Sequence, residues 1–191
     1  MRALEAWLRA VVETPGLTAL DLVDARAALL DDALRALPLL AGSEGPIVDV
    51  GSGNGSPGIP LAYALPEREV VLLEAELRRC EFLAVWAPPN ARVVRGRAEE
   101  QETDWAAFAL AKALARPPVA AEWCLPLVRP GGAAILWVGE GADLEALARA
   151  ASGLAAEPEE APPGLALLRK TGPTPDGFPR RAGVARKRPL A

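Results

Sequence analysis

A glycine-rich loop follows a short apolar run in the segment IVDVGSGNGSPGIP. The apolar run is typical of a buried parallel strand. Gly51, Gly53 and Gly55 let the backbone turn tightly and approach a ligand, because no Cβ stands in the way. Ser56 and Pro57 then predict the N-cap and the first residue of a helix whose free N–H groups point into the loop. Such a loop suits a negatively charged or polar group and predicts a nucleotide site.

The spacing of the glycines bears on which nucleotide binds. The dinucleotide fingerprint reads G-x-G-x-x-G, whereas this loop reads G-x-G-x-G. Asp49, two residues before Gly51, can accept hydrogen bonds from the loop amides or, through water, favour a cationic ligand. The pattern resembles motif I of S-adenosylmethionine-dependent methyltransferases, whose cofactor carries a sulfonium and an ammonium charge. A turn that merely closes a strand–helix connection is the alternative.

Other polar side chains fall where predicted strands end, and open α/β sheets bind ligands at the carboxyl ends of their strands. Glu74 can accept hydrogen bonds from both ribose hydroxyls of an adenosine, or it can be a solvent-facing helix cap. Glu99 and the backbone around it can meet the edge of an adenine, or they belong to an ordinary surface loop. Lys112 can hold a cofactor carboxylate or an RNA phosphate, or its amine can snorkel to the surface.

Apolar periodicity predicts an α/β fold with a doubly wound, mainly parallel sheet of Rossmann-like type. Strands alternate with helices, which indicates βαβ units and helices on both faces of the sheet. Thr18 or Asp21 is predicted to cap the second helix. Strands are predicted at 47–50, 69–74, 91–95, 107–111, 133–138 and, without a partner, 164–169, and helices at 1–12, 19–40, 57–65, 76–87, 117–128 and 142–151.

Composition narrows the function classes. At 191 residues and 51% hydrophobic, the chain is predicted to form one domain with ample core, and its apolar runs fall short of the roughly 18 residues of a membrane span. Cys80 and Cys124 lie in apolar helical patterns without metal-like spacing, which predicts core residues in a reducing cytoplasm. Histidine, the commonest general base and metal ligand, does not occur in the sequence. We expect a cytoplasmic protein without a metal.

Basic residues are concentrated at the C-terminal end. The chain has a formal net charge of −4, yet from Arg169 onward seven basic residues stand against the single acid Asp176. A compact acidic domain that ends in a basic segment suggests contact with a polyanion. A solvated tail that improves solubility is equally consistent with the composition. The candidate RNA contacts are Arg180, Arg181, Arg186, Lys187 and Arg188.

Longer runs carry a more specific resemblance. S-P-G-I-P-L after the glycine loop, G-R-A-E-E after the third predicted strand and the closing T-P…G-F-P-R-R-A-G…K-R-P-L resemble the glucose-inhibited division protein B family. Its members are S-adenosylmethionine-dependent methyltransferases that modify N7 of a guanine in small-subunit (16S) ribosomal RNA. The resemblance divides the chain into an N-terminal helical cap (1–45), a methyltransferase domain (46–170) and a basic Pro/Gly-rich tail (171–191).

The resemblance implies S-adenosylmethionine as cofactor, 16S rRNA or the small ribosomal subunit as partner, no membrane, no metal and a monomer. It assigns Gly51 and Ser56 to the methyl donor, and Ala98 and Glu99 to its adenine. Lys112 stands where the family has an arginine, so bidentate geometry would be lost, and Lys112 is the candidate for positioning substrate or cofactor. The predicted cofactor contacts are Asp49, Gly51, Gly53, Ser56, Glu74, Ala98, Glu99 and Lys112.

The implied chemistry asks little of protein side chains. Guanine N7 carries a lone pair and can attack a sulfonium methyl without prior deprotonation, so transfer depends on positioning and on excluding water. Gly16, Ala28 and Val138 depart from the family pattern. A divergent paralogue that binds S-adenosylmethionine but methylates another substrate, or is non-catalytic, therefore stays open. The loop spacing and Asp49 disfavour a third alternative, an NAD-dependent oxidoreductase.

Overall fold

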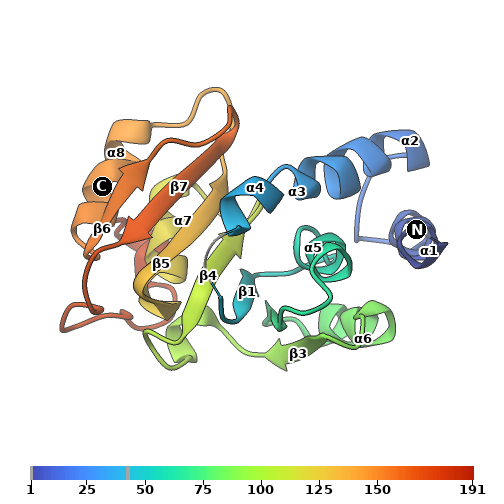
Figure 1. Ribbon diagram of the computed structural model, residues 1–191, viewed down its shortest axis with the longest axis horizontal. Helices are drawn as coiled ribbons and strands as arrows, with labels where there is room; N and C mark the ends of the chain where they lie inside the picture. Colours follow the sequence, from blue (N-terminus) through green and yellow to red (C-terminus); the bar gives the residue numbers. More distant parts are fainter. Residues whose placement is uncertain (1, 42–43) are drawn as a thin grey trace.

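The computed structural model describes residues 2–41 and 44–191, in which helices flank a seven-stranded sheet (Figure 1). Met1, Gly42 and Ser43 fall in the predicted cap and lie outside the described residues. The sheet has the order β3-β2-β1-β4-β5-β7-β6, which confirms the predicted doubly wound fold. Its strands are β1 (Ile47–Val50), β2 (Val70–Glu74), β3 (Ala91–Arg95), β4 (Ala106–Ala111), β5 (Val128–Trp137), β6 (Ala156–Glu159) and β7 (Leu165–Lys170).

The order of the strands places a binding position between β1 and β4. The chain runs outward from β1 through β2 to β3, then returns to pair β4 in parallel on the other side of β1. The connections leave these two central strands toward opposite sides, and the crevice at their carboxyl ends is where open α/β sheets bind ligands. Only β7 runs against the other strands, pairing antiparallel with both β5 and β6.

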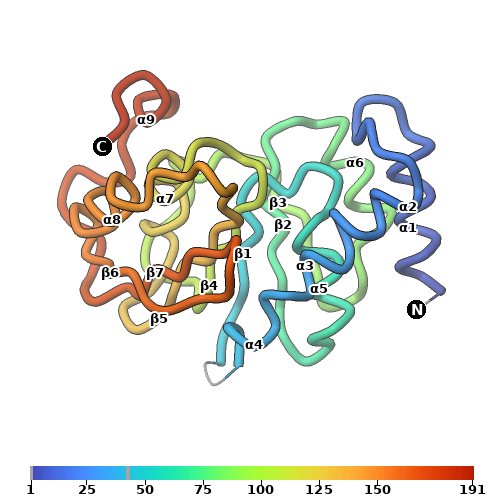
Figure 2. The backbone as a smooth tube through the Cα atoms, turned by 90° about the horizontal axis from the view of Figure 1, so that it is seen from above, coloured from blue at the N-terminus to red at the C-terminus, as the bar shows by residue number. Residues whose placement is uncertain are grey.

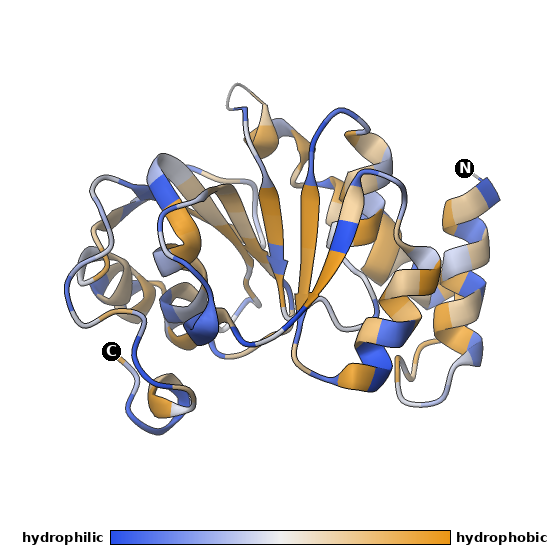
Figure 3. Cartoon of the chain, turned by 90° about the horizontal axis from the view of Figure 1, so that it is seen from below, coloured by the Kyte–Doolittle hydropathy of each residue, from blue (hydrophilic) through white to orange (hydrophobic). Residues whose placement is uncertain are grey.

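Alternation along the strands builds one core on each face of the sheet, since successive side chains point to opposite faces. Ile47 packs toward α5 and the N-terminal helices, whereas Val48 and Val50 pack toward α7 and α8. The central strands are accordingly buried along their whole length and mostly apolar (Figure 3), with Asp49 as the one charged residue of β1. The helices are α1 (Arg2–Glu13), α2 (Leu22–Ala25), α3 (Asp32–Leu34), α4 (Leu37–Leu40), α5 (Gly58–Ala64), α6 (Leu77–Trp86), α7 (Pro117–Cys124), α8 (Leu144–Ser152) and α9 (Val184–Lys187).

The predicted helix at 19–40 is broken into pieces. It begins at α2, where the Asp21 carboxylate accepts a hydrogen bond from the Asp24 N–H at 2.9 Å, so Asp21 is the cap. One wider π turn, Arg26–Asp31, then leads into α3. Pro38 lies in the first turn of α4, where its missing N–H is tolerated. Local propensity therefore predicted that residues 22–40 are mostly helical. The positions at which the helix is interrupted follow from how these residues pack against the sheet.

The sequence did not predict β6. Its residues AEPE contain a proline and two acids, which are depleted in strands. The segment forms an edge strand that pairs only with β7, and an edge position tolerates proline. β7 thereby gains partners on both sides, although its prediction had none. Strand β5 also begins earlier than predicted, with an irregularity in its pairing to β4.

The ends of the described chain lie on opposite sides of the molecule. Helix α1 lies at one end of the sheet and α9 at the other (Figure 2). Between them, the loops that follow β1, β2 and β4 form one rim. Within the described ranges, no helix has the length and apolar character needed to cross a membrane.

Candidate functional site

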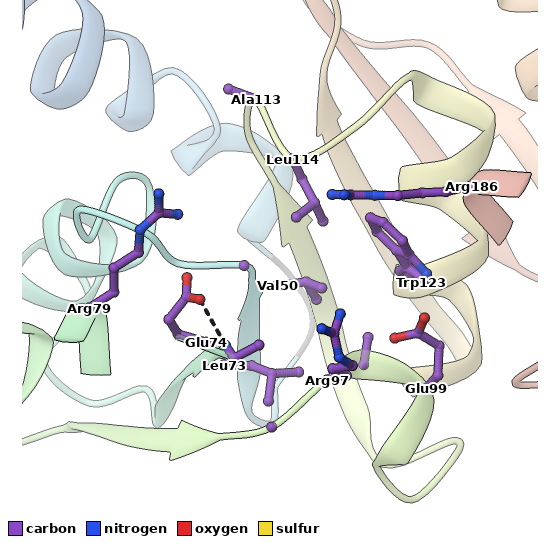
Figure 4. Close-up of a pocket in the computed structure, with 14 residues that line it drawn as sticks. Val50, Leu73, Glu74, Arg79, Arg97, Glu99, Ala113, Leu114, Trp123 and Arg186 are labelled. Carbon is purple, nitrogen blue, oxygen red and sulfur yellow. Dashed lines mark hydrogen bonds between the residues drawn. The ribbon is translucent and has the colours of Figure 1, made fainter. Parts of the chain in front are cut away.

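Two neighbouring cavities lie at the carboxyl ends of β1, β2 and β4, each with a volume of about 230 Å³. Gly51, Arg79 and Ala113 line both, so the two cavities adjoin along the glycine loop. The first extends toward the C-terminal segment (Figure 4). It is here called the adenosine-side cavity because the sequence predicts an adenosine contact at Glu74, which lines it. The second, here called the cap-side cavity, extends toward the N-terminal helices and is also lined by Leu17 and Leu29.

The glycine loop is held against the end of β2. The N–H groups of Gly51 and Ser52 both donate to the Leu73 carbonyl, at 2.8 and 3.1 Å. Gly51 has a φ of +71°, and a Cβ there would lie 2.4 Å from a methyl carbon of Leu114. Only glycine combines this left-handed backbone with so close an approach. The loop therefore turns directly beneath the segment that follows β4.

Glu74 links the loop to the end of β2. Its carboxylate accepts hydrogen bonds from the Gly53 N–H at 2.9 Å and from the Ala75 and Glu76 N–H groups at 2.8 Å. The residue is 6% exposed and lines the adenosine-side cavity (Figure 4). A carboxylate with four acceptor sites that uses three of them on amides is rigidly placed and retains acceptor capacity. The alternative of a solvent-facing helix cap is wrong, because Glu74 is buried.

Asp49 lies beneath the loop. Its Oδ2 accepts the Gly58 N–H at 3.0 Å, while its buried Oδ1 has no partner among the described residues. Burial raises the pKa of Asp49 to about 7, against the opposing effect of the Gly58 hydrogen bond. A Cβ on Gly58 would lie 2.6 Å from Oδ2, so this position excludes larger residues. Asp49 does bond an amide, as predicted, but the amide belongs to the first residue of α5.

The prediction of Ser56 as the helix N-cap is wrong. Helix α5 begins at Gly58 after Pro57, and the Ser56 hydroxyl donates instead to the Leu29 carbonyl at 2.7 Å. Nearby, the Asn54 side chain donates to the Leu17 carbonyl at 3.3 Å, and the Trp7 indole donates to the Asn54 carbonyl at 2.9 Å. The polar residues of the loop thus bind the N-terminal helices, which local sequence cannot indicate.

Lys112 joins the same helices to the end of β4. Its ammonium donates to the Ala28 carbonyl at 2.8 Å and lies 3.3 Å from Asp32 Oδ2, with 14% of the side chain exposed. The alternative of a snorkelling surface lysine is therefore wrong. Lys112 also lines the cap-side cavity, and an ammonium has three donors, of which these partners use two.

Ala98 and Glu99 both line the adenosine-side cavity, while their contact with an adenine stays a prediction. They belong to the short 3₁₀ turn Ala98–Glu100, which begins three residues after the end of β3. Ala98 is buried, and Glu99 Oε1 accepts a hydrogen bond from the Gly183 N–H at 3.3 Å. The C-terminal segment is thus attached to the loop that borders the cavity.

The basic residues of the C-terminal segment have different surroundings. Arg180 forms a two-point pair with the buried Glu122 carboxylate, which raises the pKa of the guanidinium. Lys170, 1% exposed, donates to the Leu125 carbonyl at 2.8 Å and pairs with Asp104. Arg180, a predicted RNA contact, is therefore used inside the protein. Arg181, Arg186, Lys187 and Arg188 are exposed.

Several residues that line the adenosine-side cavity were not predicted, among them Arg79, Leu114 and Trp123. Arg79 lies within the first turn of α6, after Glu74, and this closeness to a strand end was the available signal. Leu114 and Trp123 follow β4, and their apolar character in an alanine-rich stretch resembles ordinary core. The packing of α7 against the sheet is what places Leu114 and Trp123 at the surface of the cavity.

Two carboxylates of the site, those of Glu74 and Asp49, fit an adenosine-bearing, positively charged ligand. Three arginines also line the adenosine-side cavity: Arg79, Arg97 and Arg186. The Glu74 carboxylate faces the adenosine-side cavity, and the unpartnered Asp49 oxygen lies buried behind the loop. Carboxylates accept hydrogen bonds from hydroxyl groups and attract cations, but repel phosphate. Together with the sheet order, this site defines a Rossmann-like methyltransferase of the S-adenosylmethionine-dependent type.

Solved structures share this fold. The antibiotic-resistance methyltransferase Kmr matches with a TM-score of 0.54 and 18% identity, over 73% of this chain and 93% of that protein. A 16S rRNA N2 methyltransferase of T. thermophilus, solved with AdoMet and guanosine, matches with a TM-score of 0.57 and 14% identity, over 75% of this chain and 39% of that protein. At these identities the likeness concerns the fold alone.

The chain belongs to the GidB family, described as rRNA small subunit methyltransferase G, whose model matches residues 6–160. Relatives named ribosomal RNA small subunit methyltransferase G agree. The protein of Rubrobacter xylanophilus is 38% identical, over 88% of this chain and 71% of that protein. The protein of Synechococcus elongatus is 36% identical, over 83% and 75%. These matches do not favour the alternative of a divergent paralogue.

Proposed function

We propose that this protein transfers a methyl group from S-adenosylmethionine to N7 of a guanine in small-subunit (16S) rRNA. The observation that carries the proposal is the pair of adjoining cavities at the carboxyl ends of β1, β2 and β4, one of them lined by Glu74, in a chain of the rRNA small subunit methyltransferase G family. We further propose that it acts in the cytoplasm as a monomer on 16S rRNA or the small subunit.

The residues that would hold the cofactor follow from the cleft. Glu74 would accept the ribose hydroxyls, because its carboxylate is fixed by three amides yet still faces the adenosine-side cavity. Ala98 and Glu99 would border the adenine. Gly51 and Gly53 would border the methionine end, next to Ser56. When bound, the cofactor supplies a methyl group activated by a sulfonium charge.

The remaining task of the chain is to bind, orient and exclude water. Guanine N7 has a free lone pair, so the site needs no group that removes a proton. Asp49 would contribute negative charge behind the loop, opposite a cationic cofactor. Lys112 would hold the N-terminal helices at the cap-side cavity, through its hydrogen bond to the Ala28 carbonyl and its ion pair with Asp32. In this proposal the cap (1–45) and the tail (171–191) complete a site that the domain at 46–170 begins.

The test is methyl transfer from labelled S-adenosylmethionine to small ribosomal subunits and to naked 16S rRNA from a strain that lacks this protein. Cleavage at N7-methylguanine locates the modified base. We expect incorporation at one guanine. Confirmed cofactor binding by calorimetry without incorporation into either acceptor would contradict the proposed substrate, and a lack of cofactor binding would contradict the proposal as a whole.

A further inference from the structure

The C-terminal segment from Phe178 to Leu190, here called the tail segment, is anchored on the protein. Arg180 pairs with Glu122 and also donates to the Arg188 carbonyl at 2.8 Å. Ala185 is buried, and Phe178 and Leu190 pack against the core beside α7. The segment therefore has a defined position despite its basic composition.

This position brings one arginine to the adenosine-side cavity. Arg186 lines the cavity, and its guanidinium carbon lies 5.1 Å from the centroid of the Trp123 ring. Figure 4 shows Arg186 extended over Trp123, with its guanidinium end toward Leu114. A guanidinium over an indole face is held by cation–π attraction. Because its conformation is already restricted, it loses less conformational entropy when it contacts a ligand. In the described residues no carboxylate forms an ion pair with it.

The chemistry of Arg186 complements an adenine. The guanidinium offers N–H donors in a plane, and the ring nitrogens of adenine are acceptors. Leu114 and Trp123 supply apolar surface on the same wall, while Ala98 and Glu99 border the cavity from the loop after β3. The wall thus combines the apolar contact and the few placed polar groups that nucleoside pockets use.

We propose that Arg186 contacts the adenine of the bound cofactor, so that the tail segment is a wall of the cofactor site as well as an RNA contact. This inference rests on the proposed function. The exposed cations Arg181, Lys187 and Arg188 belong to the same segment. RNA that binds them therefore acts on the segment that carries Arg186, and the two ligands become thermodynamically coupled. Such coupling is reciprocal, so each ligand changes the affinity of the other by the same factor.

The first experiment measures binding of S-adenosylhomocysteine to the full chain by calorimetry, without RNA. Arg186→Ala is expected to weaken binding by about tenfold, which is the usual size of one lost contact to a charged donor. Arg186→Lys keeps the charge but loses the planar stack, and an intermediate loss is expected. Arg149→Ala, an exposed arginine on α8 outside this cavity, removes the same charge and should bind like the unmodified protein.

The second experiment measures amide hydrogen exchange in the tail segment, with and without S-adenosylhomocysteine. Slower exchange at residues 183–188 on ligand addition supports the proposal. Unchanged exchange there, or an Arg186→Ala variant that binds as tightly as the unmodified protein, overturns it. If the unmodified protein does not bind S-adenosylhomocysteine at all, the proposed function itself fails, and this outcome is distinct from the other two.

Discussion

At the scale of single residues, the main chemical feature is a buried acid behind a glycine loop. Asp49 is 1% exposed. Within the described part of the chain, its carboxylate accepts a single hydrogen bond, from the Gly58 N–H. Burying a carboxylate without a cation disfavours its charged form, which is why its pKa rises to about 7. A cationic ligand in front of the loop would favour the charged form again.

The raised pKa of Asp49 predicts how the free energy of unfolding depends on pH. The folded state holds a proton between about pH 4 and pH 7 that the unfolded chain has released, so stability from this group decreases as pH rises through that range. The slope approaches about 1.4 kcal/mol per pH unit. In Asp49→Asn this contribution is absent. The difference in free energy of unfolding between the variant and the unmodified protein, measured by urea titration, should therefore shift in favour of the variant from pH 5 to pH 8.

The control for this experiment is Asp176→Asn, which changes an exposed carboxylate in the C-terminal segment. Its unfolding profile should run parallel to that of the unmodified protein across the same range. If Asp49→Asn also runs parallel, then Asp49 has no raised pKa in the folded state, and its proposed response to a cationic ligand has no basis.

At the scale of elements, the N-terminal helices are fastened over the glycine loop. The π turn Arg26–Asp31 directs two carbonyls to the loops that follow β1 and β4: Leu29 accepts from Ser56 and Ala28 accepts from Lys112. Such turns interrupt a helix where backbone groups are needed for other contacts. The cap-side cavity therefore exists only while these helices stay in place.

Lys112 is predicted to act mainly through this attachment. In Lys112→Met, hydrogen exchange in residues 26–34 should become faster, and affinity for S-adenosylhomocysteine should decrease. Asp32→Asn keeps the lysine but weakens its ion pair, and it should produce a smaller change of the same kind. If Lys112→Met lowers affinity while exchange in residues 26–34 stays unchanged, then Lys112 acts by direct contact with the ligand.

At the scale of the whole molecule, charge is distributed in a way that composition conceals. The basic C-terminal region was predicted as one polyanion-binding unit. In the structure, Arg169 pairs with Glu159, Lys170 pairs with Asp104 and Arg180 pairs with Glu122. These pairs fix the segment against the sheet, and the exposed cations Arg181, Lys187 and Arg188 remain as the candidates for RNA phosphates.

Salt dependence measures this distinction. Replacing Arg181, Lys187 and Arg188 by alanine should lower the slope of log affinity for 16S rRNA against log salt by about 2 to 3, since each phosphate contact releases roughly 0.7 to 0.9 counterions. A variant with Arg2, Arg9 and Arg149 replaced loses the same charge at exposed positions elsewhere and should keep the slope. Equal slopes in the two variants would mean that RNA binds elsewhere.

The sequence alone determined the central strands, the glycine loop and the acids at the strand ends. Those features are local, because buried strands need apolar runs and tight turns need glycine. It therefore predicted Glu74, Ala98 and Glu99 at one rim, and the family motifs predicted the function class. It did not indicate the tertiary partners of Ser56 and Arg180, whose side chains bind Leu29 and Glu122, residues 27 and 58 positions away.

Only the tertiary structure decided which side chains remain available. A basic or hydroxyl residue offers the same donors wherever it lies in the sequence, and the partner it finds depends on which segments pack beside it. Packing committed Arg180 to α7 and Lys112 to the N-terminal helices, while it left Arg186 on the cavity wall over Trp123. Those pairings lie between distant segments, so no local pattern of residues could have specified them.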